Sequence, residues 1–388
     1  MHVVINAIPL VSTLTGIGNC IYHTARALVD LDESSRYTFY YSYFSRKLIC
    51  PDHPEEAPVD APFGALHAAK GFLDRHPVVR AVARCGAEAW HHLAALPRRF
   101  DLYYEPNYIP LPLRARRCVV TVHDLSFHVH PDWHPADRVR YFTRRFFNRI
   151  ERADVVTVDS EFTRDELLDA AKIDPARVHV VRLGCDHAIF HTRGDDEVLR
   201  FRAEHALPDR FVLFVGSIEP RKNLDRLLDA YARLPEQTRR EYKLVLAGFA
   251  GWHNEAVMRR VDAMKEHVRF LGYLDVDDLA CCYSAATVFA YPSLYEGFGL
   301  PPLEAMSCGC PVLASDIPPL REVLGDAACF VPAESVDGIS EGLANLLRDN
   351  GLRESLSARG LARARAFTWD RTAREMLGIF DDLAGRGA

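Results

Sequence analysis

The stretch Tyr-Glu-Gly-Phe-Gly-Leu-Pro-Pro-Leu-Glu-Ala, residues 295–305, decides the fold of this chain. A β-rich run, Thr287–Tyr291, precedes it. Gly297 and Gly299 permit close backbone approach, and Pro301 suits the first turn of a helix. The sequence therefore predicts a strand, a glycine-containing turn and a helix start in direct succession.

Two carboxylates flank the predicted helix start. Free N–H groups at Phe298, Gly299 and Leu300 would face an anion. Glu304, about one turn into the helix, offers two acceptor oxygens to a vicinal diol such as a ribose. Glu296, just before the helix, can reach the hydroxyls of a second sugar. The pattern favours binding of a nucleotide sugar.

The run resembles the paired-glutamate signature of retaining glycosyltransferases with the GT-B fold, in particular family 4. Other segments carry the same resemblance in the family's order: Leu-Thr-Gly-Ile-Gly-Asn (14–19), Val-His-Asp-Leu (122–125), Phe-Val-Gly-Ser-Ile-Glu-Pro-Arg-Lys-Asn-Leu (214–224) and Ala-Met-Ser-Cys-Gly-Cys-Pro-Val-Leu-Ala-Ser-Asp (305–316). The resemblance implies an α/β fold with two facing Rossmann-like, doubly wound parallel-sheet domains, an interdomain cleft and a C-terminal crossover helix.

Short apolar runs alternate with helical patterns along the chain, which favours parallel sheets built from βαβ units. With 388 residues, 48% of them hydrophobic, the chain can form two ordinary cores. We predict strands at Val3–Asn6, Leu102–Glu105, Val119–Val122, Val155–Val158 and Val178–Val181, then at Phe211–Val215, Lys243–Ala247, Val268–Leu271, Thr287–Tyr291 and Val312–Ala314.

We predict an acceptor-side domain over residues 1–190 and a nucleotide-sugar-binding domain over residues 191–366. The last segment, 367–388, has helical apolar spacing. The resemblance implies that this helix packs back on the first domain. Within 51–99, helices are predicted near 78–83 and 90–96.

Arg221 and Lys222 follow a predicted strand directly, where ligands of open parallel sheets bind. Their charges would neutralise a diphosphate leaving group. The alternative is a solvated pair on a loop, but the preceding Gly-Ser-Ile-Glu-Pro favours a function. Many family members carry an arginine where this chain has Ser217, and Arg221 can supply that charge instead.

Gly16 and Gly18 lack the third glycine of a dinucleotide fingerprint, since Ile21 stands there. The resemblance implies that this glycine loop meets the donor diphosphate, although it could be only a tight turn. His123 ends an apolar strand, so its ring is expected to emerge at the cleft. The matching family histidine lies close to the donor sugar.

After a further strand, Tyr273 and Leu274 are candidates for the pocket of the nucleotide base. Base recognition there is largely through backbone groups, so the sequence barely distinguishes guanine from uracil. The spacing of His128, His130 and His134 fits no closed zinc site well. The resemblance implies that neither a metal nor another cofactor is required.

The sequence favours a location in the cytoplasm, because no apolar run approaches the ~20 residues needed to cross a bilayer. A net charge of −6 argues against a general nucleic-acid binder. The segment 138–152 predicts an amphipathic helix with a cationic face. Further arginines from the same domain are Arg98, Arg99, Arg114, Arg116 and Arg117. Such a surface is either merely solvated or makes peripheral contact with anionic lipid at the inner face of the cell membrane.

The predicted function is retaining transfer of a hexose from a nucleotide diphosphate sugar to a hydroxyl of a lipid-linked or growing bacterial surface glycan. Resemblance to bacterial mannosyltransferases favours mannose or a related deoxyhexose, with GDP-mannose as donor. The catalytic residues would be His123, Arg221, Lys222 and Glu296. A UDP-sugar-dependent transferase, a sugar-nucleotide epimerase and a catalytically silent donor-binding subunit are the alternatives.

Overall fold

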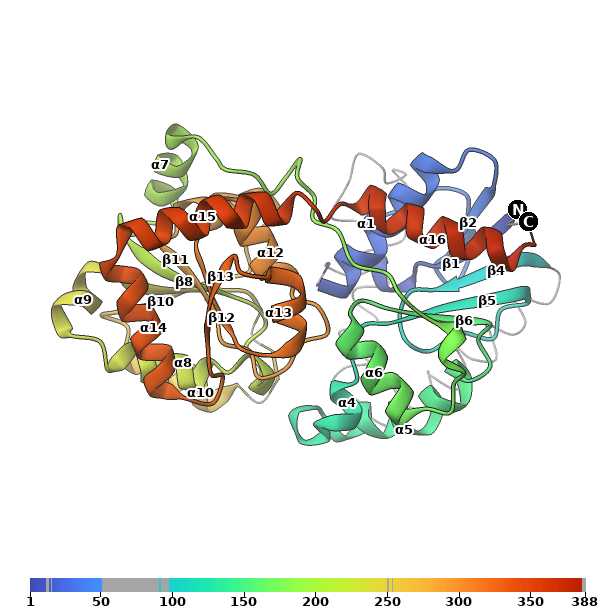
Figure 1. Ribbon diagram of the computed structural model, residues 1–388, viewed down its shortest axis with the longest axis horizontal. Helices are drawn as coiled ribbons and strands as arrows, with labels where there is room; N and C mark the ends of the chain where they lie inside the picture. Colours follow the sequence, from blue (N-terminus) through green and yellow to red (C-terminus); the bar gives the residue numbers. More distant parts are fainter. Residues whose placement is uncertain are drawn as a thin grey trace. The chain divides into compact units, whose positions relative to one another are not determined.

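A computed structural model of the chain describes residues 1–11, 14, 16–50, 91, 98–249, 251, 252 and 254–385 (Figure 1). Contacts divide the chain into two compact units. The first unit comprises Met1–Leu125, Arg140–Gly184 and Trp369–Ala388, and the second comprises Ser126–Val139 and Cys185–Thr368. The domain bounds and the cleft expected from the sequence stay predictions. Both helices expected within 51–99 fall essentially outside the described residues.

The first unit contains a seven-stranded sheet in the order β3-β2-β1-β4-β5-β6-β7. Its strands are β1 (His2–Asn6), β2 (Arg36–Tyr40), β3 (Phe44–Ser45), β4 (Phe100–Glu105), β5 (Ala115–Val122), β6 (Val155–Val158) and β7 (Val178–Val180). All neighbours pair in parallel except β2 and β3. The five strands predicted for this half are confirmed, whereas β2 and β3 were not predicted. The strand order reverses between β1 and β4, which places a ligand crevice at their carboxyl ends.

Two helices far apart in sequence, α1 (Gly16–Leu31) and α16 (Trp369–Leu383), pack together in the first unit (Figure 1). The rings of His23 and Trp369 stack with their centroids 5.3 Å apart. Phe380 meets Tyr104 of β4 edge-on at 5.8 Å. The predicted C-terminal crossover helix is therefore confirmed. The other helices in this part of the chain are α4 (Ser126–Val129), α5 (Ala136–Ile150) and α6 (Glu161–Ala170).

The second unit contains a six-stranded sheet in the order β10-β9-β8-β11-β12-β13. Its strands, all paired in parallel, are β8 (Phe211–Val215), β9 (Lys243–Ala247), β10 (Val268–Gly272), β11 (Val288–Tyr291), β12 (Val312–Ser315) and β13 (Ala328–Val331). Five of these strands were predicted and β13 was not. Here the order reverses between β8 and β11.

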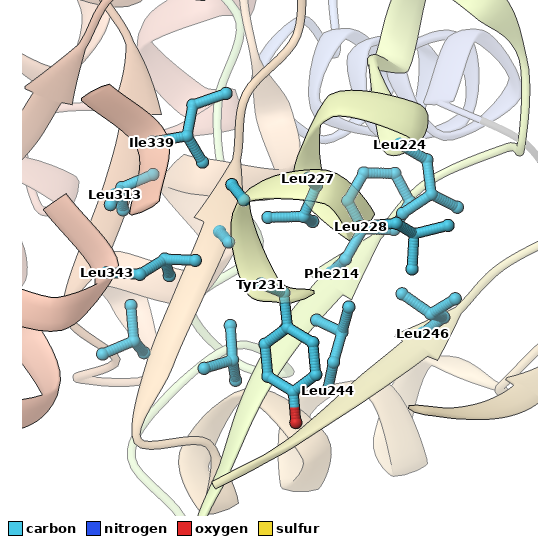
Figure 2. Close-up of a cluster of buried hydrophobic side chains, with 14 of the residues drawn as sticks. Phe214, Leu224, Leu227, Leu228, Tyr231, Leu244, Leu246, Leu313, Ile339 and Leu343 are labelled. Carbon is cyan, nitrogen blue, oxygen red and sulfur yellow. The ribbon is translucent and has the colours of Figure 1, made fainter. Parts of the chain in front are cut away.

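Helices cover both faces of this sheet, so the strands need apolar side chains on both sides. They are α7 (Asp195–Glu204), α8 (Leu224–Ala232), α9 (Glu236–Glu241), α10 (Glu255–Ala263), α11 (Val276–Ala285), α12 (Leu300–Ser307), α13 (Pro318–Leu324), α14 (Val336–Arg348) and α15 (Asn350–Ala364). Figure 2 shows one face, where side chains of α8 and α14 pack on Phe214, Leu244 and Leu313 of the sheet. Tyr231 closes this core, and its hydroxyl donates to the carbonyl of Tyr242 at 2.9 Å. A rigid sheet therefore holds the loops at its carboxyl edge.

Candidate functional site

The loops after β8 and β11 bring Arg221, Lys222 and Glu296 together. Arg221 Nη1 donates to Glu296 Oε2 at 2.7 Å, and Lys222 Nζ donates to Oε1 at 2.6 Å. The backbones of the two loops are also joined, because the N–H of Leu294 donates to the carbonyl of Arg221 at 2.9 Å. These loops follow the two strands at which the strand order reverses, the position where open α/β sheets bind ligands.

Asn223 fixes the basic pair in place. Pro220–Lys222 form a short 3-10 helix, and Asn223 then adopts a left-handed conformation with φ of 60° before α8 begins. Its side-chain amide donates to the carbonyls of Pro292 at 2.8 Å and Ala333 at 2.7 Å. An asparagine tolerates this conformation better than most residues. Sequence reasoning did not assign Asn223 a role, although its place directly after the basic pair was a usable signal.

The cluster is buried, ionised and balanced in charge. Lys222 is 7% exposed and Glu296 5% exposed. Burial alone would raise the pKa of Glu296, but the charges of Arg221 and Lys222 outweigh it and hold that pKa at about 2. Burial and the neighbouring charge of Arg221 lower the pKa of Lys222. Glu219, which was not predicted, pairs with Arg221 at 2.8 Å, so two carboxylates face two cations.

Tyr291 at the end of β11 completes the cluster. The ammonium of Lys222 donates to its hydroxyl at 2.6 Å, and the hydroxyl donates to Glu296 Oε1 at 2.8 Å. Both oxygens of Glu296 are therefore engaged, and Lys222 has two of its three donors in use. The arrangement orients the two cations rigidly, which is the preorganisation that stabilises developing negative charge.

Glu304 lies apart from this cluster, one turn into α12. It accepts a hydrogen bond from the hydroxyl of Tyr283 on α11 at 3.1 Å. It makes no hydrogen bond or ion pair with Arg221 or Lys222. Burial raises the pKa of Glu304 to about 7, and the bond from Tyr283 offsets this only in part. The carboxyl group thus changes its charge near neutral pH.

The turn before α12 requires glycine. Gly299 has φ of 104°, and a Cβ there would come within 2.5 Å of Leu320 Cδ2. Leu300 is the first residue of the helix, and the two prolines that follow carry no N–H. Phe298 is buried, with its ring 5.9 Å from that of Phe367. The helix start therefore offers few donors, concentrated at Gly299 and Leu300.

The residues predicted for the base, Tyr273 and Leu274, directly follow β10. Tyr273 is exposed and stacks on Phe249 with ring centroids 4.5 Å apart. Leu274 is buried, and Ser217 is half-buried in the loop after β8. The stacked aromatic pair offers a flat apolar surface suited to a base.

Gly16 and Gly18, expected to lie in a glycine loop or a tight turn, both lie in the first turn of α1, which begins at Gly16. Both therefore belong to a helix start and not to a flexible turn ahead of it. The reason is local packing: at Gly18 the helix approaches Leu14 so closely that a Cβ would come within 2.8 Å of its side chain.

His123 differs from expectation. Its side chain is buried, at 8% exposure, and the ring does not project freely from the core. Nδ1 lies 2.7 Å from Asp159 Oδ2, and Nε2 lies 2.9 Å from the carbonyl oxygen of Pro106. Both ring nitrogens therefore have partners inside the first unit. Sequence reasoning missed Asp159, although it ends the strand next to that of His123.

Another unpredicted carboxylate, Glu105, lies at the strand reversal of the first sheet. Glu105 is the last residue of β4 and is 1% exposed. Its carboxylate accepts hydrogen bonds from residues at the ends of both β1 and β4. The Asn6 amide, at the end of β1, donates to its two oxygens at 3.0 and 2.9 Å, and the N–H of Asn107 donates at 3.0 Å. Glu105 thus ties together the two strands between which the order reverses.

Two features are absent from the described part of the chain. There is no group of three or more His, Cys, Asp or Glu side chains placed to hold a metal ion. In the same residues, no helix has both the length and the apolar character that crossing a membrane requires.

Comparison with known proteins defines the class. Residues 14–189 match the family described as Glycosyltransferase Family 4, and residues 195–363 match Glycosyl transferases group 1. O-antigen chain mannosyltransferase B of Escherichia coli is 36% identical over 315 residues, which cover 80% of this chain and 81% of that protein. The chain belongs to glycosyltransferase family 4.

Solved structures agree on the fold. Sucrose-phosphate synthase from Thermosynechococcus elongatus superposes with a TM-score of 0.71 at 20% identity, covering 99% of both chains. The Anabaena protein HepE, solved in complex with UDP-glucose, gives a TM-score of 0.67 at 16% identity over 98% of this chain and 100% of that one. The predicted GT-B fold is confirmed.

Proposed function

We propose that this chain is a retaining mannosyltransferase that moves mannose from GDP-mannose to a hydroxyl of a growing bacterial surface glycan, as in O-antigen synthesis. One observation carries the proposal. A buried, charge-balanced cluster of Arg221, Lys222 and Glu296 lies where the strand order of the second sheet reverses. The chain that holds it is 36% identical to an O-antigen mannosyltransferase. Because this relative is a mannosyltransferase, we favour mannose over a related deoxyhexose.

The donor would contact residues of the second unit on the two loops that follow β8 and β11, where the strand order reverses. Arg221 and Lys222 would take the diphosphate, with the N–H groups of Gly299 and Leu300 as further donors. Glu304 would accept from the ribose hydroxyls. By role, the remaining predicted contacts are Tyr273 and Leu274 for the base, Ser217 and Phe298 beside the phosphates, Glu296 for the sugar, and Gly16 and Gly18 for the diphosphate. A role of His123 at the sugar stays a prediction from the sequence, because both of its ring nitrogens are engaged by Asp159 and Pro106.

The chemistry that suits this cluster is a front-face displacement. The bond between the anomeric carbon and the diphosphate oxygen breaks, the acceptor oxygen bonds to the same face, and the leaving phosphate oxygen takes the acceptor proton. Glu296 is a poor candidate for the covalent nucleophile, because both of its oxygens are held by Arg221, Lys222 and Tyr291. The two cations would stabilise the departing diphosphate without a metal.

A donor panel tests the proposal. GDP-mannose is expected to raise the midpoint of thermal unfolding more than UDP-, ADP- or dTDP-sugars at equal concentration, because a ligand that binds only the folded state stabilises it by mass action. GDP release is expected only with a suitable glycan acceptor, to persist with EDTA present, and to yield an α-linked product by NMR.

Each other outcome identifies an alternative. Stabilisation and turnover with UDP-sugars alone would assign a different donor. Isomerisation of the sugar nucleotide without acceptor would indicate an epimerase. Donor binding with no turnover across a wide acceptor panel would indicate a binding subunit, and a β-linked product would exclude retention.

We also propose that the protein works in the cytoplasm, in peripheral contact with anionic lipid at the inner face of the cell membrane. A groove of about 440 Å³ at the amino ends of β1, β2 and β4 is lined by four arginines. They are Arg36, Arg46, Arg98 and Arg99. None of them forms an ion pair in the part of the chain that the structure describes. Four arginines lining one groove, with the guanidinium of Arg98 over the ring of Phe44, suit lipid phosphates.

The double substitution Arg36→Gln, Arg46→Gln is expected to weaken binding to vesicles containing phosphatidylglycerol about 30-fold, since each arginine near an anionic surface contributes about 1 kcal/mol. Co-sedimentation at low and high salt measures it. The matched control, Arg259→Gln with Arg374→Gln, removes the same charge elsewhere. An equal loss of vesicle binding in both double variants would show that only net charge matters. Equally strong binding to neutral vesicles would contradict the proposal.

A further inference from the structure

His123 and Asp159 face each other from the ends of two neighbouring strands. Val122 of β5 is the register partner of Val158 of β6, so the residues that follow leave the sheet side by side. Asp159 is 2% exposed and His123 8%. The 2.7 Å contact between His123 Nδ1 and Asp159 Oδ2 is therefore shielded from water. The family resemblance did not predict this contact.

The partners of the ring fix the number of protons on this pair. The carbonyl oxygen of Pro106 can only accept, so His123 Nε2 must carry a proton to make its 2.9 Å bond. The 2.7 Å contact between Nδ1 and Asp159 Oδ2 needs a second proton between the two atoms. A neutral imidazole beside an ionised carboxylate has only one proton for these two bonds. His123 and Asp159 together therefore hold two protons on these two bonds, one more than a neutral imidazole beside an ionised carboxylate.

The surrounding charges support the extra proton. Burial disfavours an imidazolium, but the charge of Asp159 and its hydrogen bond outweigh burial and raise the pKa of His123, with a smaller contribution from Asp124. Among the described residues, the other titratable groups around the pair are Tyr104 on β4, Cys20 on α1 and Tyr108, whose ring meets that of His123 edge-on at 5.6 Å, with Glu105 beyond Tyr104. The segment of α16 at this pocket contributes Thr372 and Met376, which carry no charge.

The second oxygen of Asp159 has an unusual environment. Asp159 Oδ1 is buried and has no hydrogen-bond partner among the described residues. Asp159 and His123 line a cavity of about 10 Å³ together with Thr24, Thr121 and Thr157. Such a volume accommodates about one water molecule. Of the two oxygens of Asp159, Oδ2 is thus bonded to the ring of His123 and Oδ1 to no described residue, which suits a carboxylate that orients the ring.

We infer that Asp159 is a positioning residue for His123: it orients the ring and keeps the pair doubly protonated through neutral pH. His123 is then an N–H donor and not a general base. The carbonyl that it holds belongs to Pro106, at the start of a turn in which Tyr108 has φ of 62° and bonds to the carbonyl of Thr121 at 3.0 Å. The pair thereby fixes the turn that follows β4 at the strand reversal of the first sheet.

NMR of the full-length protein labelled with ¹⁵N-histidine tests the protonation directly. His123→Gln identifies the signals. In the unmodified protein both ring nitrogens are expected to stay protonated until well above pH 6.5, the ordinary histidine midpoint. In Asp159→Asn the midpoint is expected to fall below 6.5, because burial then acts without a facing charge. A midpoint at or below 6.5 for His123 in the unmodified protein would overturn the inference, whether or not Asp159→Asn folds.

A kinetic comparison tests the positioning role, which rests on the proposed transferase function. For Asp159→Asn, kcat/KM is expected to fall as pH rises through the lowered midpoint and to recover in part at acidic pH. Asp154→Asn changes the same residue type at the other end of β6, where Asp154 bonds to Arg117 and the N–H of Cys118. Its profile should parallel that of the unmodified protein. Parallel profiles for all three proteins would refute positioning. Absence of transfer with every donor would refute the proposed function and leave the NMR result standing.

Discussion

Lys222→Met is expected to lower kcat about 100- to 1,000-fold, the loss typical of removing one preorganised donor from a developing anion. Lys222 is buried, and its ammonium is held by Glu296 at 2.6 Å and Tyr291 at 2.6 Å. Its position therefore needs no rearrangement when the diphosphate departs. Methionine keeps most of the apolar stem of lysine and removes the ammonium group, with its charge and its donors. Release of GDP with donor and acceptor saturating measures the effect.

Stability must be followed in the same variant, because removing one member of a buried ion pair also destabilises a fold. Glu296 would still be paired with Arg221 at 2.7 Å, so the variant is expected to fold. Lys265→Met, an exposed lysine of the same unit, is the matched control and should retain full activity. A kcat within a few-fold of normal in folded Lys222→Met would remove Lys222 from the site.

The clearest sequence signals belong to strands whose side chains are apolar on both faces. Phe211–Val215 and Val155–Val158 are buried at every position, and continuous β-branched or aromatic runs mark them. The missed strands have weaker patterns. Arg36–Tyr40 begins with an exposed charge, and Ala328–Val331 is a four-residue edge strand that is only half-buried at its centre. Position at an edge does not by itself hide a strand, because the edge strands β7 and β10 were predicted.

The same limit applies to the site. Motif spacing placed Arg221, Lys222 and Glu296 on two loops, and strand order then brought those loops together. Spacing cannot show which side chains become partners, because that depends on register between strands. Tyr291 was assigned to a strand and Asp159 ended one, yet their hydrogen bonds arise only once β11 and β6 are set beside their neighbours. The burial of His123 has the same origin.

Glu304→Ala is expected to raise the KM for the nucleotide-sugar donor about 10- to 100-fold, since hydrogen bonds to a charged group contribute about 1.5–3 kcal/mol. The effect on kcat should be smaller, because ribose contacts form equally in the ground state and the transition state. Initial rates with varied donor at saturating acceptor measure both constants. Glu255→Ala, an exposed residue of the same unit, is the control.

The pH dependence of KM gives a sharper test of Glu304. Its pKa lies at about 7, raised by burial, so the carboxyl group is mostly protonated at pH 6 and mostly ionised at pH 8. An ionised carboxylate can accept from both hydroxyls of a diol, whereas a protonated one keeps a donor on one oxygen. The KM for donor should therefore fall as pH rises from 6 to 8. Glu304→Gln removes the titration and should abolish this slope. A slope that persists in Glu304→Gln would assign it to another group and place the ribose elsewhere.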